Sequence, residues 1–185
     1  MAKMAPTTKR TEYDYVVIGG GVSSLGLIVE LCEYRKGKTI LVVDQHAQLG
    51  GQWNDAYDYV RLHGHTWTYT VQGFPWPPDI EANRAHQATK KELLTYFKGI
   101  QDWIVAQGVE ILFEHEMRSK QLVSHQEYGV SLRKYERLDE MGSSTEGGPT
   151  FDILARKLIL CTHTSALWCS NLALLMLLVH RPEVQ

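Results

Sequence analysis

The sequence predicts an α/β fold with a parallel sheet, and three observations lead to this fold class. Tyr15 to Gly19 is a run of β-branched and aromatic residues, as expected for a buried parallel strand. Three consecutive glycines follow this run and open a segment with helical spacing. A second apolar run then ends in Asp44, so the whole unit has the length of a β-α-β motif, about 30 residues.

Length, composition and charge limit what the chain can be. Its 185 residues, 44% of them hydrophobic, suffice for one domain with a core but not for two of ordinary size. The net charge of −2 and the scattered basic residues predict no nucleic-acid partner. The three cysteines form no C-x-x-C pair, which favours free thiols in a reducing, cytoplasmic compartment. Residues 1–10 are polar, so we expect a disordered tail and no secretory signal.

The helix of the motif is expected over Val22 to Tyr34, and the second strand over Thr39 to Asp44. Helical spacing places five small or apolar residues on one face, which should pack on the sheet: Val22, Leu25, Gly26, Val29 and Cys32. The turn between strand and helix is therefore the place to look for chemistry.

That turn has the spacing of a dinucleotide-binding fingerprint. Gly19 allows a tight turn, and Gly21 allows a pyrophosphate to approach the backbone without a Cβ in the way. The helix that follows presents unpaired N–H groups and a partial positive charge. Ser24 replaces the third glycine and is still small, and Asp44 can accept hydrogen bonds from a ribose. The alternative is a glycine-rich turn in another α/β fold.

A second glycine pair indicates which dinucleotide is bound. Gly50 and Gly51 lie in the segment "LGGQW", shortly after Asp44. A nicotinamide dehydrogenase does not need this pair, whereas a flavoprotein chain must pass close to the phosphates and the ribityl arm of the cofactor. The alternative is an ordinary loop.

Over residues 13–165 the sequence resembles the N-terminal FAD domain of flavin-containing monooxygenases. The motifs that carry the resemblance occur in order: "VVIGGGVSSLGL", the acid, "LGGQW", "YVRLHGHTWTY", "GFPWPP", "GVEILFEHEMRSK" and "ARKLILCTHT". Between "GFPWPP" and "GVEILFEHEMRSK" lies an amphipathic helix with Leu93, Tyr96, Phe97, Ile100, Trp103 and Ile104 on one side. The resemblance implies a Rossmann-like FAD-binding domain over residues 11–165, with a parallel sheet and a small antiparallel strand insertion.

The resemblance also implies roles for individual residues. Gly19, Gly21 and Ser24 would hold the FAD pyrophosphate, and Asp44, with Gln45 beside it, would hold the adenosine ribose. The ribityl side would be lined by Gly50, Gly51 and Trp53. The backbone at Met117 would contact the adenine, and Cys161 and Thr162 would end the strand that closes the domain. His163 stands where the family usually has glycine, and its Cβ would crowd the cofactor.

Other residues have weaker interpretations. His63 falls near a position that faces the flavin in relatives, which makes it a candidate catalytic residue; a solvated loop histidine is the alternative. His63 and His65 have no third ligand at a familiar spacing, so no metal site is expected. Trp67, Trp76 and Trp103 are expected to be packing residues, and residues 142–149 a hairpin loop.

The resemblance implies an FAD-dependent oxidoreductase in which NADPH and O₂ drive oxygenation of a small-molecule substrate. Two alternatives remain open. The first alternative is a non-catalytic FAD-binding module. The second is an NAD-binding dehydrogenase domain, which the "LGGQW" segment disfavours.

The last part of the chain departs from the family. No second glycine fingerprint for NADPH is visible, so we expect a truncated form that consumes NADPH no faster than free FAD does. Residues 166–185 are interpreted as a divergent apolar tail, with a short core helix as the alternative. The apolar stretch 166–179 is too short to span a bilayer, which takes about 20 residues. Residues 172–179 are expected to promote self-association.

Overall fold

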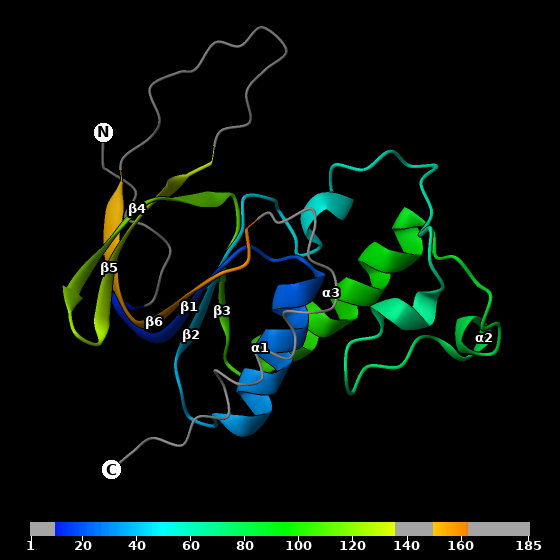
Figure 1. Cartoon of the computed structure of the whole chain (residues 1–185), viewed down its shortest axis with the longest axis horizontal. Helices are drawn as coiled ribbons and strands as arrows, with labels where there is room; N and C mark the ends of the chain where they lie inside the picture. Colours follow the sequence, from blue (N-terminus) through cyan, green and yellow to red (C-terminus); the bar gives the residue numbers. More distant parts are fainter. Residues whose placement is uncertain (1–9, 136–149, 163–185) are drawn as a thin grey trace, which may run out of the picture.

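The computed structural model describes residues 10–135 and 150–162. Figure 1 shows one six-stranded sheet with two long helices against one of its faces. The elements follow in the order β1 (Glu12–Ile18), α1 (Val22–Tyr34), β2 (Ile40–Val43), η1 (Gly51–Trp53), η2 (Thr66–Tyr69), α2 (Pro78–Glu81), α3 (Lys90–Ala106), β3 (Glu110–Leu112), β4 (His115–Ser124), β5 (Glu127–Lys134) and β6 (Phe151–Leu160).

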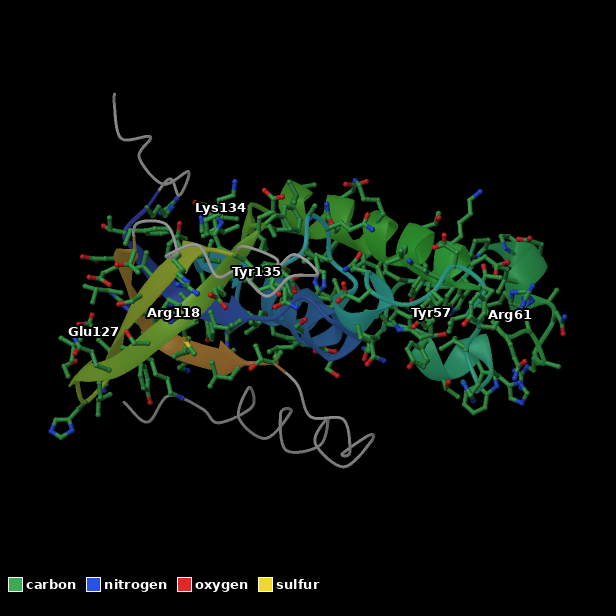
Figure 2. All side chains as sticks on the ribbon, turned by 90° about the horizontal axis from the view of Figure 1, so that it is seen from above. Tyr57, Arg61, Arg118, Glu127, Lys134 and Tyr135 are labelled. Carbon is green, nitrogen blue, oxygen red and sulfur yellow. The ribbon has the colours of Figure 1, made fainter. Side chains whose placement is uncertain are left out.

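The sheet confirms the predicted fold class. Its strand order is β3-β2-β1-β6-β5-β4. Strands β3, β2, β1 and β6 run parallel, and the β4–β5 hairpin pairs antiparallel with β6. The antiparallel insertion therefore continues the parallel sheet at the β6 edge. The hairpin and the loop after η1 lie at opposite ends of the molecule, as Arg118 and Tyr57 show in Figure 2.

The central strands are buried on both faces, which explains their continuous apolar sequence. In β2, Ile40 and Val42 belong to the cluster shared with α1 and α3, whereas Leu41 and Val43 belong to a second cluster with β5 and β6. Successive side chains of a strand point to opposite faces, so a strand covered on both sides needs apolar residues throughout.

Helix α1 has the predicted bounds, but its buried residues cover more of the helix surface than the single face that was predicted. Its buried residues are Ser24, Leu25, Leu27, Ile28, Val29 and Leu31, while Val22, Gly26 and Cys32 are only partly buried. The reason is that α1 packs against α3 as well as against the sheet, so more than one side of the helix is covered.

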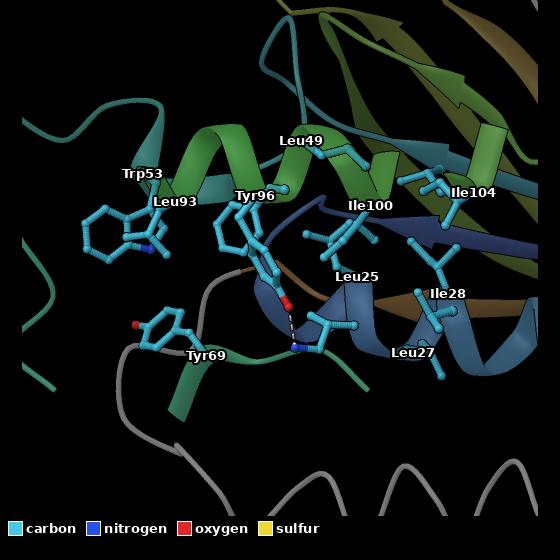
Figure 3. Packing of buried hydrophobic residues seen from close by; sticks show 14 of the residues in the cluster. Leu25, Leu27, Ile28, Leu49, Trp53, Tyr69, Leu93, Tyr96, Ile100 and Ile104 are labelled. Atoms are coloured by element: carbon cyan, nitrogen blue, oxygen red, sulfur yellow. Dashed lines mark hydrogen bonds between the residues drawn. The ribbon is translucent and has the colours of Figure 1, made fainter. Parts of the chain in front are cut away.

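Helix α3 presents the predicted apolar side, and Figure 3 shows it packed against α1. The helix begins in a capping box, in which Thr89 and Glu92 satisfy each other's backbone N–H groups. The Tyr96 hydroxyl accepts a hydrogen bond from the Val71 N–H (2.8 Å) and donates one to the Phe74 carbonyl (2.7 Å). These bonds tie the "GFPWPP" loop to α3.

The tryptophan prediction is confirmed at two positions and wrong at the third. Trp76 is buried and stacks on Tyr96, and Trp103 packs edge-on against Phe74. Trp67 is 62% exposed, because η2 turns Thr66 and Tyr69 toward the core and leaves Trp67 on the other side.

Some predictions fall outside the described residues: the tail 1–9, the loop 142–149, His163 and the stretch 166–185. Among the described helices, none has the length and apolar character needed to cross a membrane.

Candidate functional site

A cleft of about 720 Å³ lies where the carboxyl ends of β1, β2 and β6 meet the amino end of α1. Its volume is within the range of about 300–1,000 Å³ that is usual for ligand sites. Open α/β sheets bind ligands at this edge. The structure brings all the predicted cofactor-binding residues to this cleft: Gly19, Gly21, Ser24, Asp44, Gln45, Gly50, Gly51, Trp53, Met117 and Thr162.

The first glycine is required by its own backbone and by a neighbouring strand. Gly19 has a φ of +100°, a conformation that L-residues rarely adopt. A Cβ at this position would lie 2.8 Å from the carbonyl oxygen of Cys161, at the end of β6. Gly19 therefore lets β1 and β6 approach each other at the edge that forms the cleft.

The middle glycine is also required, although the fingerprint leaves that position free. A Cβ on Gly20 would lie 2.5 Å from Cδ2 of Leu49 and 2.9 Å from Oδ2 of Asp44. The Gly20 N–H donates to Oδ2 of Asp44 at 2.5 Å, and its carbonyl accepts from the Gly50 N–H at 2.8 Å. Gly20 thus joins the first turn to Asp44 and to the second glycine pair.

The two glycine turns lie against each other in the cleft. Gly51 has a φ of +53°, and a Cβ there would lie 2.9 Å from Cα of Gly21. Gly21 itself is extended, and a Cβ on it would meet nothing nearer than Cα of Gly51 at 4.0 Å. Gly21 therefore leaves open space at the amino end of α1, where no described side chain caps the helix.

Ser24 is fully buried and lies in the first turn of α1. Its hydroxyl donates to the carbonyl oxygen of Gly21 at 2.7 Å. The small side chain keeps the close packing that glycine gives at this position, and its hydroxyl finds a partner within the turn.

Asp44 is 5% exposed and accepts three hydrogen bonds from the protein. Oδ2 accepts from Gly20, and Oδ1 accepts from the His46 N–H at 2.8 Å and contacts Nδ1 of the same histidine at 2.8 Å. An ionised carboxylate offers about four acceptor positions, so one remains on Oδ2 for a ligand hydroxyl.

His46 connects Asp44 to the segment after the second glycine pair. Its Nε2 lies 2.7 Å from Oδ2 of Asp55, which follows η1. Burial lowers the pKa of His46, but hydrogen bonds and charge from Asp55 and Asp44 outweigh burial and raise the pKa above its ordinary value. The histidine is therefore held between two carboxylates at the wall of the cleft.

Aromatic side chains close one side of the cleft. Trp53 is buried and meets Tyr69 edge to face, with ring centroids 6.2 Å apart. Burial raises the pKa of Tyr69 to about 12, so its hydroxyl keeps its proton at neutral pH. Together the two rings form the wall of that part of the cleft.

The start of β4 and the end of β6 complete the lining. Met117 follows Glu116, whose carboxylate accepts from Nε of Arg133 at 2.7 Å. Burial raises the pKa of the Cys161 thiol to about 11, so the thiol stays protonated at neutral pH.

His63 is exposed and is not among the residues that line the cleft. Its carbonyl accepts a hydrogen bond from Nε2 of Gln87 at 2.9 Å. Its predicted role beside the flavin stays a prediction. Within residues 10–135 and 150–162, no group of three or more His, Cys, Asp or Glu side chains is arranged to hold a metal ion.

Sequence reasoning missed Gly20, His46 and Asp55. The run of three glycines was a signal for Gly20, since the fingerprint needs only the first and third of them. His46 and Asp55 gave no signal, because their pairing depends on the second glycine pair folding back against the first.

Replacing Asp44 should affect stability as well as binding. Asp44→Ala leaves the buried Gly20 N–H and the His46 ring without their acceptor. We expect the free energy of unfolding to fall by about 1–3 kcal/mol. Urea denaturation followed by circular dichroism measures this change.

Asp58→Ala is the control, because Asp58 is fully exposed and pairs only with Lys90 among the described residues, so a change within about 0.5 kcal/mol is expected. An Asp44→Ala protein as stable as the wild type would contradict the bonding described above.

Sequence comparisons identify a Rossmann-like domain. Residues 17–89 match the family described as NAD(P)-binding Rossmann-like domain. An uncharacterized protein of Mycobacterium tuberculosis is 38% identical over 55 residues, which are 30% of this chain and 10% of that protein. The match thus covers about a tenth of that relative's length.

Solved structures share the fold over most of the chain. Bacillithiol disulfide reductase Bdr from Bacillus cereus matches with a TM-score of 0.60 and 13% identity, over 80% of this chain and 39% of that one. A flavin-containing monooxygenase from Stenotrophomonas maltophilia matches with a TM-score of 0.59 and 22% identity, over 83% and 39%. The chain therefore spans about two fifths of each of these proteins and has the fold of that part.

Proposed function

We propose that this chain, whose residues 17–89 match the family described as NAD(P)-binding Rossmann-like domain, is the FAD-binding part of an oxidoreductase of the flavin monooxygenase type. The observation that carries the proposal is the pair of glycine turns that lie against each other in one cleft. Gly21 leaves space at the amino end of α1, and Gly51 comes so close to Gly21 that a side chain on Gly51 would not fit. The folds shared with a flavin-containing monooxygenase and a disulfide reductase support it.

The residues of the cleft fit an adenine dinucleotide. The amino end of α1 and the backbone of Gly21 would hold the diphosphate, because a helix amino end attracts anions. The acceptor position left on Oδ2 of Asp44 would take one hydroxyl of the adenosine ribose. The backbone around Met117, at the start of β4, would lie against the adenine.

The second glycine pair favours FAD over a nicotinamide dinucleotide. Gly50 and Gly51 extend the cleft beyond the first turn, toward Trp53 and Tyr69. A longer cofactor with a ribityl arm needs such an extension.

The chemistry would come from the cofactor, and the protein would bind and shield it. FAD, when bound, supplies a ring that can accept a hydride and pass electrons on. Trp53 and Tyr69 exclude water on the side of the ribityl arm, and Tyr69 keeps its proton. NADPH, O₂ and a small-molecule substrate are the reactants that this proposal assigns to the whole protein.

Binding of FAD is the first test. Purified protein should show flavin absorbance bands or acquire them on reconstitution. Isothermal titration calorimetry should then give a lower Kd for FAD than for NAD. A folded protein that binds NAD with micromolar Kd and does not bind FAD would contradict the proposal.

A nicotinamide-binding domain is the second candidate, favoured by the family match over residues 17–89. The same titration separates the two, because this candidate requires tighter binding of NAD or NADP than of FAD. A non-catalytic FAD-binding module is the third candidate. Fast, saturable bleaching of the flavin absorbance by NADPH, followed in a stopped-flow instrument, would contradict this third candidate and also the expected truncation.

A further inference from the structure

His46 has a carboxylate at each of its ring nitrogens. Nδ1 lies 2.8 Å from Asp44 and Nε2 lies 2.7 Å from Asp55. A neutral imidazole has only one N–H, so one of these contacts would then bring a nitrogen lone pair against a carboxylate oxygen. The imidazolium donates at both nitrogens and satisfies both contacts.

Through these contacts His46 joins two parts of the cleft that are separate along the chain. Asp44 also binds the N–H of Gly20, in the first glycine turn. Asp55 follows η1, which begins at Gly51 of the second glycine turn. The Asp44–His46–Asp55 chain therefore spans from one glycine turn to the segment that follows the other.

The charge of the cleft also depends on His46. The described residues that line it include the carboxylates of Asp44, Asp55 and Glu116, and no lysine or arginine. With His46 protonated, the Asp44–His46–Asp55 chain has a formal charge of −1, and without that proton its charge is −2. A diphosphate is itself an anion, so loss of the proton makes the cleft less favourable for it.

We infer that His46, as an imidazolium, is a positioning residue for the dinucleotide: it fixes Asp44 and the segment that follows the second glycine turn, and affinity for the dinucleotide falls as the ring loses its proton. The inference rests on the proposed function, since it assumes that a dinucleotide binds in this cleft.

Other titratable groups face His46 or line the clefts beside it. They are Tyr69, Glu114, His115, Glu116, Tyr135 and Cys161. The Glu114 N–H donates to the His46 carbonyl at 3.1 Å, and the His115 N–H donates to the Asp44 carbonyl at 3.0 Å. His115 is the second histidine of the cleft, so the test includes a variant at this position.

The direction of the pH effect follows from the raised pKa of His46. Protonation of His46 stabilises the Asp44–His46–Asp55 chain, and this stabilisation is fully present below the pKa of an unfolded histidine, about 6.5. The contribution is lost as pH rises through the higher pKa of the folded state. Affinity for FAD should therefore be greatest near pH 6 and fall at higher pH.

The experiment is a titration of the whole chain with FAD between pH 6 and 9, with circular dichroism at each pH to confirm folding. The diphosphate of FAD stays ionised throughout this range. For the wild type we expect Kd to rise about tenfold. His46→Gln should bind weakly at every pH, with less than about twofold variation, because glutamine carries no titrating charge. Asp55→Asn should move the transition to lower pH, because it removes one of the two carboxylates that raise the pKa.

If the inference holds, two control variants show the same dependence of Kd for FAD on pH as the wild type. His115→Gln tests the second histidine of the cleft, and His125→Gln tests a histidine at the β4–β5 turn. A wild-type Kd for FAD that does not change with pH overturns the inference. The inference is also overturned if the pH dependence of Kd is lost in His115→Gln and kept in His46→Gln. If His46→Gln does not fold, an unchanged midpoint in Asp55→Asn overturns it. Folded wild-type protein that binds no FAD at any pH overturns the proposed function instead.

Discussion

Gly19→Ala is expected to lower the free energy of unfolding by about 2–4 kcal/mol. Two costs add at this position. The backbone must keep a φ of +100°, which alanine disfavours, and the new Cβ would lie 2.8 Å from the Cys161 carbonyl oxygen. That oxygen belongs to the backbone at the end of β6, so it cannot move without disturbing the pairing of β6 with β1. Urea denaturation followed by tryptophan fluorescence measures the change.

Gly37→Ala is the matched control for this prediction. Gly37 also has a positive φ, +79°, but a Cβ there would meet nothing within 4 Å. Gly37→Ala should therefore lower the free energy of unfolding only by the cost of placing alanine at a positive φ, about 1–2 kcal/mol. The difference between the two variants measures the close approach of β1 and β6. Equal losses for both variants would show that this approach is not a constraint.

Gly21→Val is expected to raise the Kd for FAD at least tenfold, which is about 1.4 kcal/mol, while the protein stays folded. Gly21 is extended, with φ −78° and ψ 178°, so valine can adopt its backbone conformation. A Cβ at Gly21 meets no described atom closer than 4.0 Å, so the side chain would enter the space proposed for the diphosphate. Isothermal titration calorimetry with FAD gives the Kd.

Gly26→Ala controls for changes in α1 itself. Gly26 lies one turn further along the helix, and a Cβ there meets nothing within 4 Å. We expect its Kd for FAD to match that of the wild type and its stability to rise slightly, because alanine favours helices. If Gly21→Val folds and binds FAD as tightly as Gly26→Ala does, the phosphates lie elsewhere.

These variants separate two roles that the fingerprint combines. Gly19 is needed by the fold, because its φ and the nearby β6 backbone leave no room for a side chain. Gly21 is open toward the cleft, so its substitution tests ligand binding with little effect on the fold. Substitution of Gly19 should change stability, and substitution of Gly21 should change affinity for FAD.

The amino-acid sequence by itself determined the β-α-β unit, the long amphipathic helix and the first glycine turn with Asp44 after the second strand. These follow from apolar periodicity and from glycines at fixed spacing, which are properties of neighbours along the chain. The carboxyl ends of parallel strands meet at one edge, so residues just after β1, β2 and β6 come together once the sheet is recognised.

Only the tertiary structure decided how the residues of that edge are bonded. Gly20, His46 and Asp55 gained their roles when the second glycine pair folded back onto the first, which no local pattern encodes. The exposure of Trp67 was decided in the same way, by which side of η2 faces the core. Burial and hydrogen-bond partners depend on segments far apart in the sequence, and their approach is fixed by packing of the whole domain.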